Sequence, residues 1–357
     1  MATKTFENAK RKKADEFYTQ WVDIEKEVQA YLEFNPDVFR GKTILCPCDD
    51  PYESNFFKYF AVHFNSLGLK KLIATCYIGS PIASTQLTLF ENEPEESKTT
   101  RVPHKIVITE TPDKNTDSVA DMSDIEWLLA SKKNVLTRLD GDGDFRSDEI
   151  KVLRNEADFV ITNPPFSLFR EFMAWIIEAQ KQFLVISNMN AITYKEIFPL
   201  IKNDRMWMGL GFGRSFQGFI VPKSYPLNGS EARINEQGNR IVSTNNTIWL
   251  TNIDHGRRHQ PLKLMTMEEN LRFSKHKDIR GKESYARYDN YDAIEVPFTD
   301  AIPSDYDGTM GVPISFLYKY CPEQFEIIKF RKGDDDKDLS ISGKCPYFRI
   351  LIKNKTL

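Results

Sequence analysis

The chain lacks several patterns that would place it in common protein classes. Its five cysteines, at positions 46, 48, 76, 321 and 345, include no Cys-x-x-Cys pair, which argues against a disulfide framework or a zinc ribbon. No apolar stretch approaches the ~18 residues of a membrane span, and no N-terminal stretch resembles a signal peptide. These absences predict a cytoplasmic protein with free thiols, no membrane contact and no metal site.

Two nucleotide-binding motifs are also missing. No Gly-x-Gly-x-x-Gly follows the first apolar strand, which disfavours a nicotinamide dinucleotide site, and there is no Walker phosphate loop. The run GLGFG at 209–213 has no Lys-Ser/Thr after it, so we interpret it as a hairpin or bulge. The net charge of −3 does not indicate binding to nucleic acid, although a basic binding surface can be local.

What the chain does contain is an alternation of strand and helix periodicity over its first two thirds. Strands are predicted at 43–48, 71–77, 134–139, 158–162 and 183–186, and helices at 14–32, 56–67, 123–130 and 167–180. This alternation is typical of an α/β fold with an open, doubly wound, mostly parallel sheet. Antiparallel strands at 208–213, 216–221 and 247–250 are expected to close that sheet.

Two regions depart from this alternation. We interpret 79–118 as an insertion, with one strand at 106–109. From about residue 254 onward helix periodicity is weak, and turn residues, tyrosines and charges dominate. The length of 357 residues allows two domains, so we predict a second, irregular domain there.

The most informative turn is Asn163-Pro164-Pro165-Phe166, which follows the apolar strand at 158–162. The Asn163 side-chain oxygen can accept a hydrogen bond from an NH2 group, and the rigid prolines leave a backbone carbonyl as a second acceptor. The Phe166 ring offers a face for a flat base. The turn therefore predicts a grip on a planar amino group. The alternative is a rigid strand-to-helix turn with Ser167 as N-cap.

Other strand ends carry polar groups as well. Ligands of open α/β sheets bind beyond the carboxyl ends of the strands, so the segments 46–50 and 140–145 are candidate walls of a nucleoside site. Asp144 could accept from an adenine amine, Phe145 could stack on the ring, and Asp49 could face a cationic amino-acid end. The acidic run that starts at Asp140 is not a calcium loop. An EF-hand loop needs Gly at its sixth position and Glu at its twelfth, and these positions are Phe145 and Lys151 here.

These strand ends also have plainer interpretations. Segment 140–145 can be an acidic turn, and Asp49-Asp50 can cap the next helix. Cys46 and Cys48 are better interpreted as small buried side chains than as metal ligands.

Residues 255–287 form a cation-rich segment. It holds nine Lys and Arg against four Asp and Glu, with three histidines interleaved. Such an excess suits a surface that follows DNA phosphates, although it can also be an ordinary solvated face. Tyr285, Tyr288 and Tyr291 can stack on bases or fill the core. The candidate DNA-binding residues are Arg257, Arg258, Lys263, Arg272, Lys275, Lys277, Arg280 and Lys282.

The order of these motifs resembles the EcoRI-type adenine-specific DNA methyltransferase family, which uses S-adenosylmethionine. The segments that carry the likeness are Asp15–Thr19 (DEFYT), Cys46–Pro51 (CPCDDP) with Ser54–Phe56, Gly141–Arg146 (GDGDFR), the proline turn, and in the C-terminal half YDNYDAI at 288–294, DYDGTMGVP at 305–313 and PEQFEI at 322–327. The likeness spans nearly the whole chain.

The resemblance implies methyl transfer from S-adenosylmethionine to N6 of an adenine that is flipped out of duplex DNA. It implies Asn163, Pro164, Pro165 and Phe166 as catalytic residues. The cofactor-binding residues that it implies are Phe17, Tyr18, Thr19, Pro47, Cys48, Asp49, Asp144 and Phe145. The strand ending at Tyr77 lacks the acidic residue that most relatives use for the ribose, so the ribose partner is not assigned.

The resemblance also implies a division of labour along the chain. Residues 1–38 would be a helical segment on the cofactor site, 39–253 the methyltransferase domain, and 254–357 the target-recognition region. Double-stranded DNA is the expected partner, and a cognate restriction endonuclease that shares the DNA site without stable contact stays an open question. Methylation of RNA adenine or of a protein amide, or a non-catalytic DNA-binding role, stays an alternative.

Overall fold

The computed structural model describes residues 18–51, 54–76, 103–111, 136–212, 216–221, 232–243 and 246–355, together with Met122, Asp124, Ile125 and Trp127. Phe17, Tyr77, most of the expected 79–118 insertion and most of the expected helix at 123–130 lie outside these residues. The chain divides into two compact units. Unit 1 takes in Met1–Met189 and Gly209–Ile253, and unit 2 takes in Asn190–Met208 and Asp254–Leu357. The segment Asn190–Met208, inside the expected 39–253 domain, thus clusters with the C-terminal part.

The main sheet has eight strands in the order β5-β4-β3-β2-β6-β7-β12-β8. They are β2 (Thr43–Cys46), β3 (Lys71–Thr75), β4 (His104–Ile108), β5 (Leu136–Arg138), β6 (Phe159–Thr162), β7 (Gln182–Asn188), β8 (Trp207–Phe212) and β12 (Thr247–Thr251). The four central strands β3, β2, β6 and β7 are parallel. The pairs β3–β4, β4–β5 and β7–β12 are antiparallel. The α/β class with a large central sheet is confirmed.

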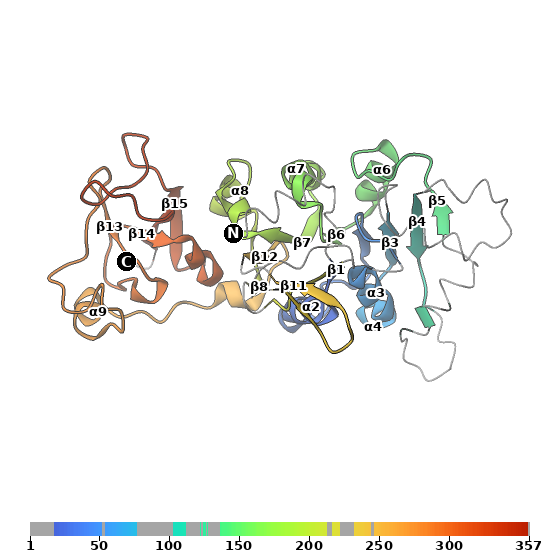
Figure 1. Cartoon of the computed structure of the whole chain (residues 1–357), viewed down its shortest axis with the longest axis horizontal. Helices are drawn as coiled ribbons and strands as arrows, with labels where there is room; N and C mark the ends of the chain where they lie inside the picture. Colours follow the sequence, from blue (N-terminus) through green and yellow to red (C-terminus); the bar gives the residue numbers. More distant parts are fainter. Residues whose placement is uncertain are drawn as a thin grey trace. The chain divides into compact units, whose positions relative to one another are not determined.

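The central strands are buried on both faces, which explains their short, continuous apolar sequences such as TILC in β2 and FVIT in β6. The helices α2 (Trp21–Phe34), α3 (Asn55–Val62) and α4 (Phe64–Leu67) cover one face. The helices α6 (Asp148–Glu156) and α7 (Phe169–Glu178) cover the other (Figure 1). Side chains from α2, α3 and alternate positions of the strands form one apolar core.

Two helix expectations need correction. The helix expected from residue 14 begins at Trp21, because Tyr18–Thr19 form a short strand, β1, that pairs with Phe219 and Ile220. Helix α6 was not expected, since its sequence DEIKVLRNE is mostly polar. Its N-cap is Ser147, whose hydroxyl accepts from Ile150 N, with Asp148 and Glu149 in the first turn. That start signal was present in the sequence.

The strands expected to close the main sheet divide between two sheets. β8 and β12 join the main sheet, but β9 (Phe219–Val221) does not. It belongs to a small sheet in the order β1-β9-β11-β10, with β10 at Ala232–Ile234 and β11 at Arg240–Val242. The expectation that 216–221 closes the main sheet is therefore wrong. Short apolar runs do not encode their pairing partners.

Gly209 and Gly211 are explained by close packing within a strand, and the expectation of a hairpin or bulge at these two positions is wrong. Gly209 and Gly211 lie in β8, where the backbone N–H groups of Leu210 and Gly211 donate to the buried Glu27 carboxylate of α2. A Cβ at Gly209 would lie 2.0 Å from Glu27 Oε1 and 2.7 Å from Trp249 Cβ. Only glycine admits the helix this close to the strand.

Unit 2 is more regular than the sequence indicated. It contains a four-stranded sheet in the order β13-β14-β16-β15, made of Ala293–Glu295, Thr309–Pro313, Arg349–Asn354 and Phe325–Phe330. Helix α8 (Phe198–Lys202) packs on β15, with the Phe198 and Phe330 rings 5.0 Å apart. Helix α9 (Met267–Phe273) begins with a capping box of Thr266 and Glu269. The expectation of an irregular domain is corrected. These strands were hard to recognise because burial does not alternate regularly along β14, β15 or β16, so their sequences show no clear period of two.

Within the ranges that the structure describes, the other helical turns are short 3-10 helices. They lie at Phe166–Leu168, Met189–Thr193, Gly256–His259, Thr299–Ala301 and Ile314–Lys319.

Candidate functional site

The sheet order places a switch point between β2 and β6. From β2 the chain continues to β3 on one side, and it later returns to β6 on the other side. In an open α/β sheet, ligands bind outside the carboxyl ends of the strands at such a point. The turn after β2 contains Pro47, Cys48 and Asp49, and the turn after β6 contains Asn163. The two motifs that the sequence singled out therefore lie at the same edge of the sheet.

Asp49 connects the two turns directly. Its carboxylate is 5% exposed and accepts hydrogen bonds from the hydroxyls of Ser54, at 2.6 Å, and of Thr162, at 2.5 Å. Burial raises the pKa of Asp49 to about 7, although both hydroxyls oppose the shift. Asp49 forms no salt bridge with any residue in the described part of the chain. Thr162 was recognised in the sequence only as the residue before the turn and was given no role, although a hydroxyl in an otherwise apolar strand was an available signal.

Asp50 lies at the end of the neighbouring strand β3. It is 7% exposed, and its charge acts on the thiol of Cys76, the residue after β3, which donates to the His104 carbonyl at 3.7 Å. Burial, and next the Asp50 charge, raise the pKa of Cys76 to about 11. On the same side, the Thr75 hydroxyl donates to the Pro47 carbonyl at 2.9 Å. The turn after β2 thus brings a carboxylate to the place where β3 itself has none.

Thr19, in strand β1, lies beside the same turn. Its carbonyl accepts from Asn55 Nδ2 at 2.8 Å, and Asn55 is the first residue of α3. The Thr19 hydroxyl is buried and has no hydrogen-bond partner among the described residues. A buried hydroxyl in that state suits contact with a polar ligand. Asn55 is a second residue that the sequence analysis missed.

Asp144 belongs to the same group of side chains. The Cys48 thiol lies near both Asp49 and Asp144, and its pKa is raised first by burial and then by these two charges. Arg146 binds Asp144 through two hydrogen bonds of 2.8 and 2.6 Å and holds the pKa of that carboxyl below its ordinary value. Arg146 also pairs with Glu171 at 2.8 Å. The Arg146 backbone N–H also donates to Asp144, at 2.8 Å, so one acceptor site on Oδ2 is left for a ligand amine.

Phe145 is placed differently from its predicted role. It is 4% exposed, and its ring packs edge-on against Phe172 and Trp175 of α7, with centroids 5.1 and 5.7 Å away. The ring is committed to the core beneath the site, so its faces are not open to an adenine in this structure.

The turn after β6 leads into a 3-10 helix at Phe166–Leu168 and then into α7. The N-cap position of α7 is Leu168, without a side-chain hydrogen bond, so Ser167 does not cap this helix. The half-buried ring of Phe166 meets Phe219 of β9 edge-on, with centroids 6.3 Å apart. Phe219 is itself the strand partner of Thr19. Phe166 and Thr19 are therefore neighbours of one residue, Phe219, which the sequence analysis also missed.

The cation-rich segment 255–287 lies in unit 2, and not all of its charges face solvent. Arg258 is 8% exposed. Its guanidinium pairs with Asp204 and Asp254 and lies over the Trp207 ring, 3.7 Å from the centroid. Arg257 is half-buried, 5.9 Å from the Tyr318 ring centroid. Arg258 is thus a structural residue rather than a surface cation.

The remaining cations of the segment are exposed. Arg272 pairs with Glu268 at 3.0 Å and Lys275 pairs with Asp300 at 2.6 Å. The exposed cations that make no ion pair with any described residue are Lys263, Lys277, Arg280 and Lys282. The neighbouring Tyr285 and Tyr288 are buried, which favours the core interpretation for these two tyrosines.

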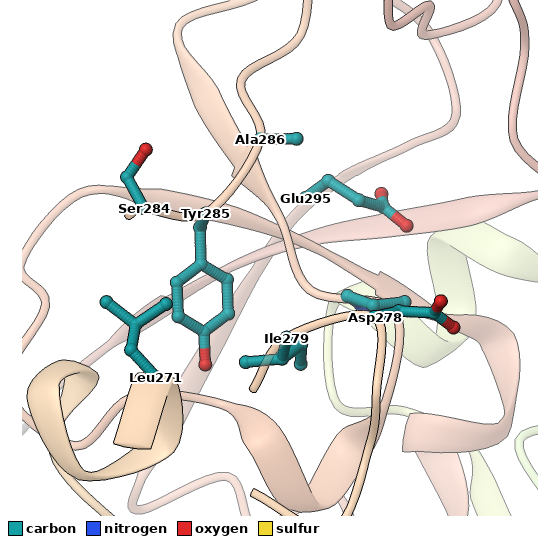
Figure 2. Close-up of a pocket in the computed structure, with 8 residues that line it drawn as sticks. Leu271, Asp278, Ile279, Ser284, Tyr285, Ala286 and Glu295 are labelled. Atoms are coloured by element: carbon teal, nitrogen blue, oxygen red, sulfur yellow. The ribbon is translucent and has the colours of Figure 1, made fainter. Parts of the chain in front are cut away.

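A hollow of about 200 Å³ is lined in part by residues of the same segment (Figure 2). Leu271, Ile279 and Tyr285 form its apolar side, and Asp278 and Glu295 contribute carboxylates. The Tyr285 hydroxyl donates to the Ala301 carbonyl at 2.7 Å. None of the residues of the two strand-end turns lines this hollow.

The fold is an α/β sheet whose two paired turns lie at a switch point, the place where such sheets bind ligands. The family of adenine-specific methyltransferase EcoRI matches residues 5–355, and the chain belongs to this family. The resemblance seen in the sequence is confirmed. Among the residues that the structure describes, no helix is both long and apolar enough to cross a bilayer.

Three curated relatives are similar over almost their full length. The chain is 50% identical to Type II methyltransferase M.EcoRI of Escherichia coli, over 99% of this chain and 97% of the relative. It is 31% identical to Type II methyltransferase M.MpnI of Mycoplasma pneumoniae, over 98% of each. It is also 31% identical to Type II methyltransferase M.MgeORF184P of Mycoplasma genitalium, over 99% of each. No solved structure matches significantly.

Proposed function

We propose that this protein is a site-specific DNA methyltransferase that transfers a methyl group from S-adenosylmethionine to N6 of adenine. One observation carries the proposal. The hydrogen bond between Asp49 and Thr162 joins the turn after β2 to the Asn163-Pro164-Pro165-Phe166 turn. A cofactor turn and an amine-gripping turn at one switch point are what methyl transfer to a flat amine requires. Membership of the adenine-specific family supports the choice of amine.

The residues at the strand ends fit this cofactor. The buried Thr19 hydroxyl, without a described partner, and the carboxylate of Asp144 suit its polar and amine groups. Asp50, held at the end of β3, suits the ribose hydroxyls, a role for which β3 itself has no acidic residue. When bound, the cofactor would supply a methyl group on a positively charged sulfur. Pro47 and Cys48 belong to the turn after β2 and would contact the cofactor. Tyr18, which precedes Thr19 in β1, is a further candidate.

In this proposal the chain's own groups position the amine. The Asn163 side-chain oxygen and the Pro164 carbonyl accept hydrogen bonds from the two N–H groups of the adenine amine. These bonds favour a more tetrahedral nitrogen whose lone pair is available for attack. Phe166 stacks on the flipped base. Pro165 keeps the turn rigid, so the rate depends on positioning and electrostatics, without a covalent enzyme intermediate.

The finer fold assignment belongs to the same proposal. Parallel central strands with helices on both faces support a doubly wound, Rossmann-like methyltransferase domain. We assign DNA contacts to the C-terminal region, through the exposed Lys263, Lys277, Arg280 and Lys282. A cognate restriction endonuclease acting at the same DNA site would need no stable contact with this chain.

The test is a comparison of substrates. The purified protein is incubated with S-adenosylmethionine labelled in its methyl group and with duplex DNA, RNA or protein. Label in DNA, recovered as N6-methyladenine, is the expected result. Label in RNA or in a protein amide would contradict the proposed substrate, and no transfer to any of them would contradict the proposed activity.

A further inference from the structure

Asp49 contacts the catalytic side of the site as well as the cofactor side. One carboxylate oxygen accepts from the Thr162 hydroxyl, and the other accepts from the Ser54 hydroxyl. Thr162 is the last residue of β6, is 0% exposed and directly precedes Asn163. Ser54 caps α3, since its hydroxyl accepts from Phe56 N at 3.1 Å. One carboxylate therefore connects a strand end, a turn and a helix start.

This arrangement is unusual for a ligand-binding carboxylate. Both oxygens of Asp49 are engaged by hydroxyls of the chain itself, and the residue is 5% exposed. A buried carboxylate without a positively charged partner is costly, and burial raises its pKa to about 7. A hydrogen bond between groups buried away from water meets no competing solvent and is electrostatically strong, so the Thr162 contact is stiff. A stiff contact at this point restrains the backbone that presents Asn163.

We propose that Asp49 is a positioning residue, which holds the Asn163 turn in register with the cofactor turn through its hydrogen bond to Thr162. The inference rests on the proposed methyl transfer and deepens it. Asp49 then acts through Thr162, rather than by binding the cationic amino-acid end of the cofactor. Such positioning matters because the reaction rate depends steeply on distance. A displacement of about 1 Å between reacting groups can slow a reaction about a hundredfold.

Thr162→Val tests the contact, since valine has the same shape and lacks the hydroxyl. We expect the single-turnover rate at saturating cofactor to fall about tenfold to a hundredfold, with the cofactor dissociation constant within about threefold of wild type. Thr162→Ser keeps the hydroxyl and should restore most of the rate. Asp49→Asn leaves one acceptor oxygen for two hydroxyl donors and should slow transfer similarly. The double variant should be little slower than the slower single variant, because both changes act on the contact between residues 49 and 162.

Thr251→Val is the matched control. Thr251 is also a fully buried strand threonine, and its hydroxyl donates to the Phe183 carbonyl at 2.7 Å, away from the two turns. This variant should lose stability but keep the rate. Thermal unfolding of all the variants separates lost rate from lost fold, and Thr162→Ser remains informative if the valine variant folds poorly.

Two outcomes would overturn the proposal. The first is a near-normal rate in Thr162→Val together with weak cofactor binding in Asp49→Asn, which would make Asp49 a direct cofactor ligand. The second is an equal loss of rate in the Thr251→Val control. Failure of the proposed function looks different, because wild-type protein itself would then transfer no methyl group to adenine in DNA.

Discussion

Sequence patterns predicted residue roles well at the strand-end turns of unit 1. They predicted them poorly in the cation-rich segment of unit 2. At the strand ends, residues distant in sequence meet as the sheet topology requires, and Asp49 reaches Thr162 across 113 positions. In the segment 255–287, an excess of positive charge did not show which residues face solvent and are available to DNA. Arg258 is the clearest case, since it is buried between two carboxylates and an aromatic ring. Strand ends follow a geometric rule, whereas a charge count does not say which charges are already neutralised.

The largest effect is expected from a substitution in the strand-end turns of unit 1. Asn163→Ala removes one of the two proposed acceptors of the amine, so methyl transfer should fall about a hundredfold to a thousandfold, as when a preorganised hydrogen-bonding group is lost. Cofactor binding should survive, because Asn163 holds the amine and not the cofactor. Single-turnover methylation and equilibrium cofactor binding measure the two quantities. Near-normal turnover would remove the turn from the mechanism.

The second prediction concerns pH and the buried Asp49. Its pKa is about 7 in the folded protein against about 4 in an unfolded chain, so its stabilising contribution is complete below pH 4 and is lost as pH rises through 7. Asp49→Asn cannot ionise. From pH 5 to pH 8 the stability of wild type should therefore fall by about 3 kcal/mol relative to the variant. Urea unfolding of both proteins at the two pH values measures this, and a pH-independent difference would contradict it.

The third prediction tests whether Arg258 is structural. Arg258→Ala should lower the stability of unit 2 by about 2 kcal/mol, because two carboxylates lose their partner and Trp207 loses a cation above its ring. Chemical unfolding monitored by tryptophan fluorescence measures the change. DNA affinity of the folded fraction should be close to wild type. Lost affinity without lost stability would return Arg258 to the DNA-contacting set.

The smallest effect is expected on the exposed side of the same segment. Replacing Lys277, Arg280 and Lys282 together by alanine should weaken DNA binding about tenfold and lower the salt slope by about 2 to 3, uniformly across DNA sequences. Stability should not change, since these side chains form no described ion pairs. Fluorescence anisotropy at several salt concentrations is the measurement. An unchanged salt slope would place the DNA contacts elsewhere.

Much of unit 1 could be predicted from sequence, because its central strands are continuous apolar runs and its helices carry wide apolar stripes. The β9 strand could not be placed, since three residues of alternating burial fit either sheet. The sequence does not show whether the Phe145 ring is buried or exposed for stacking, because its burial against Phe172 and Trp175 depends on where α7 lies. Unit 2 was the least predictable, since its residues pair over long sequence distances in short strands.

The amino-acid sequence by itself determined the family, the α/β class and the turn that would grip an amine, because motifs of fixed local geometry need no neighbours to be recognised. Only the tertiary structure decided which carboxylate serves which purpose. Asp49, Asp50 and Asp144 are chemically alike, and they differ in what surrounds them: two hydroxyls, a thiol or a guanidinium. Those surroundings come from strands and helices far apart in the chain, so no local pattern could contain them.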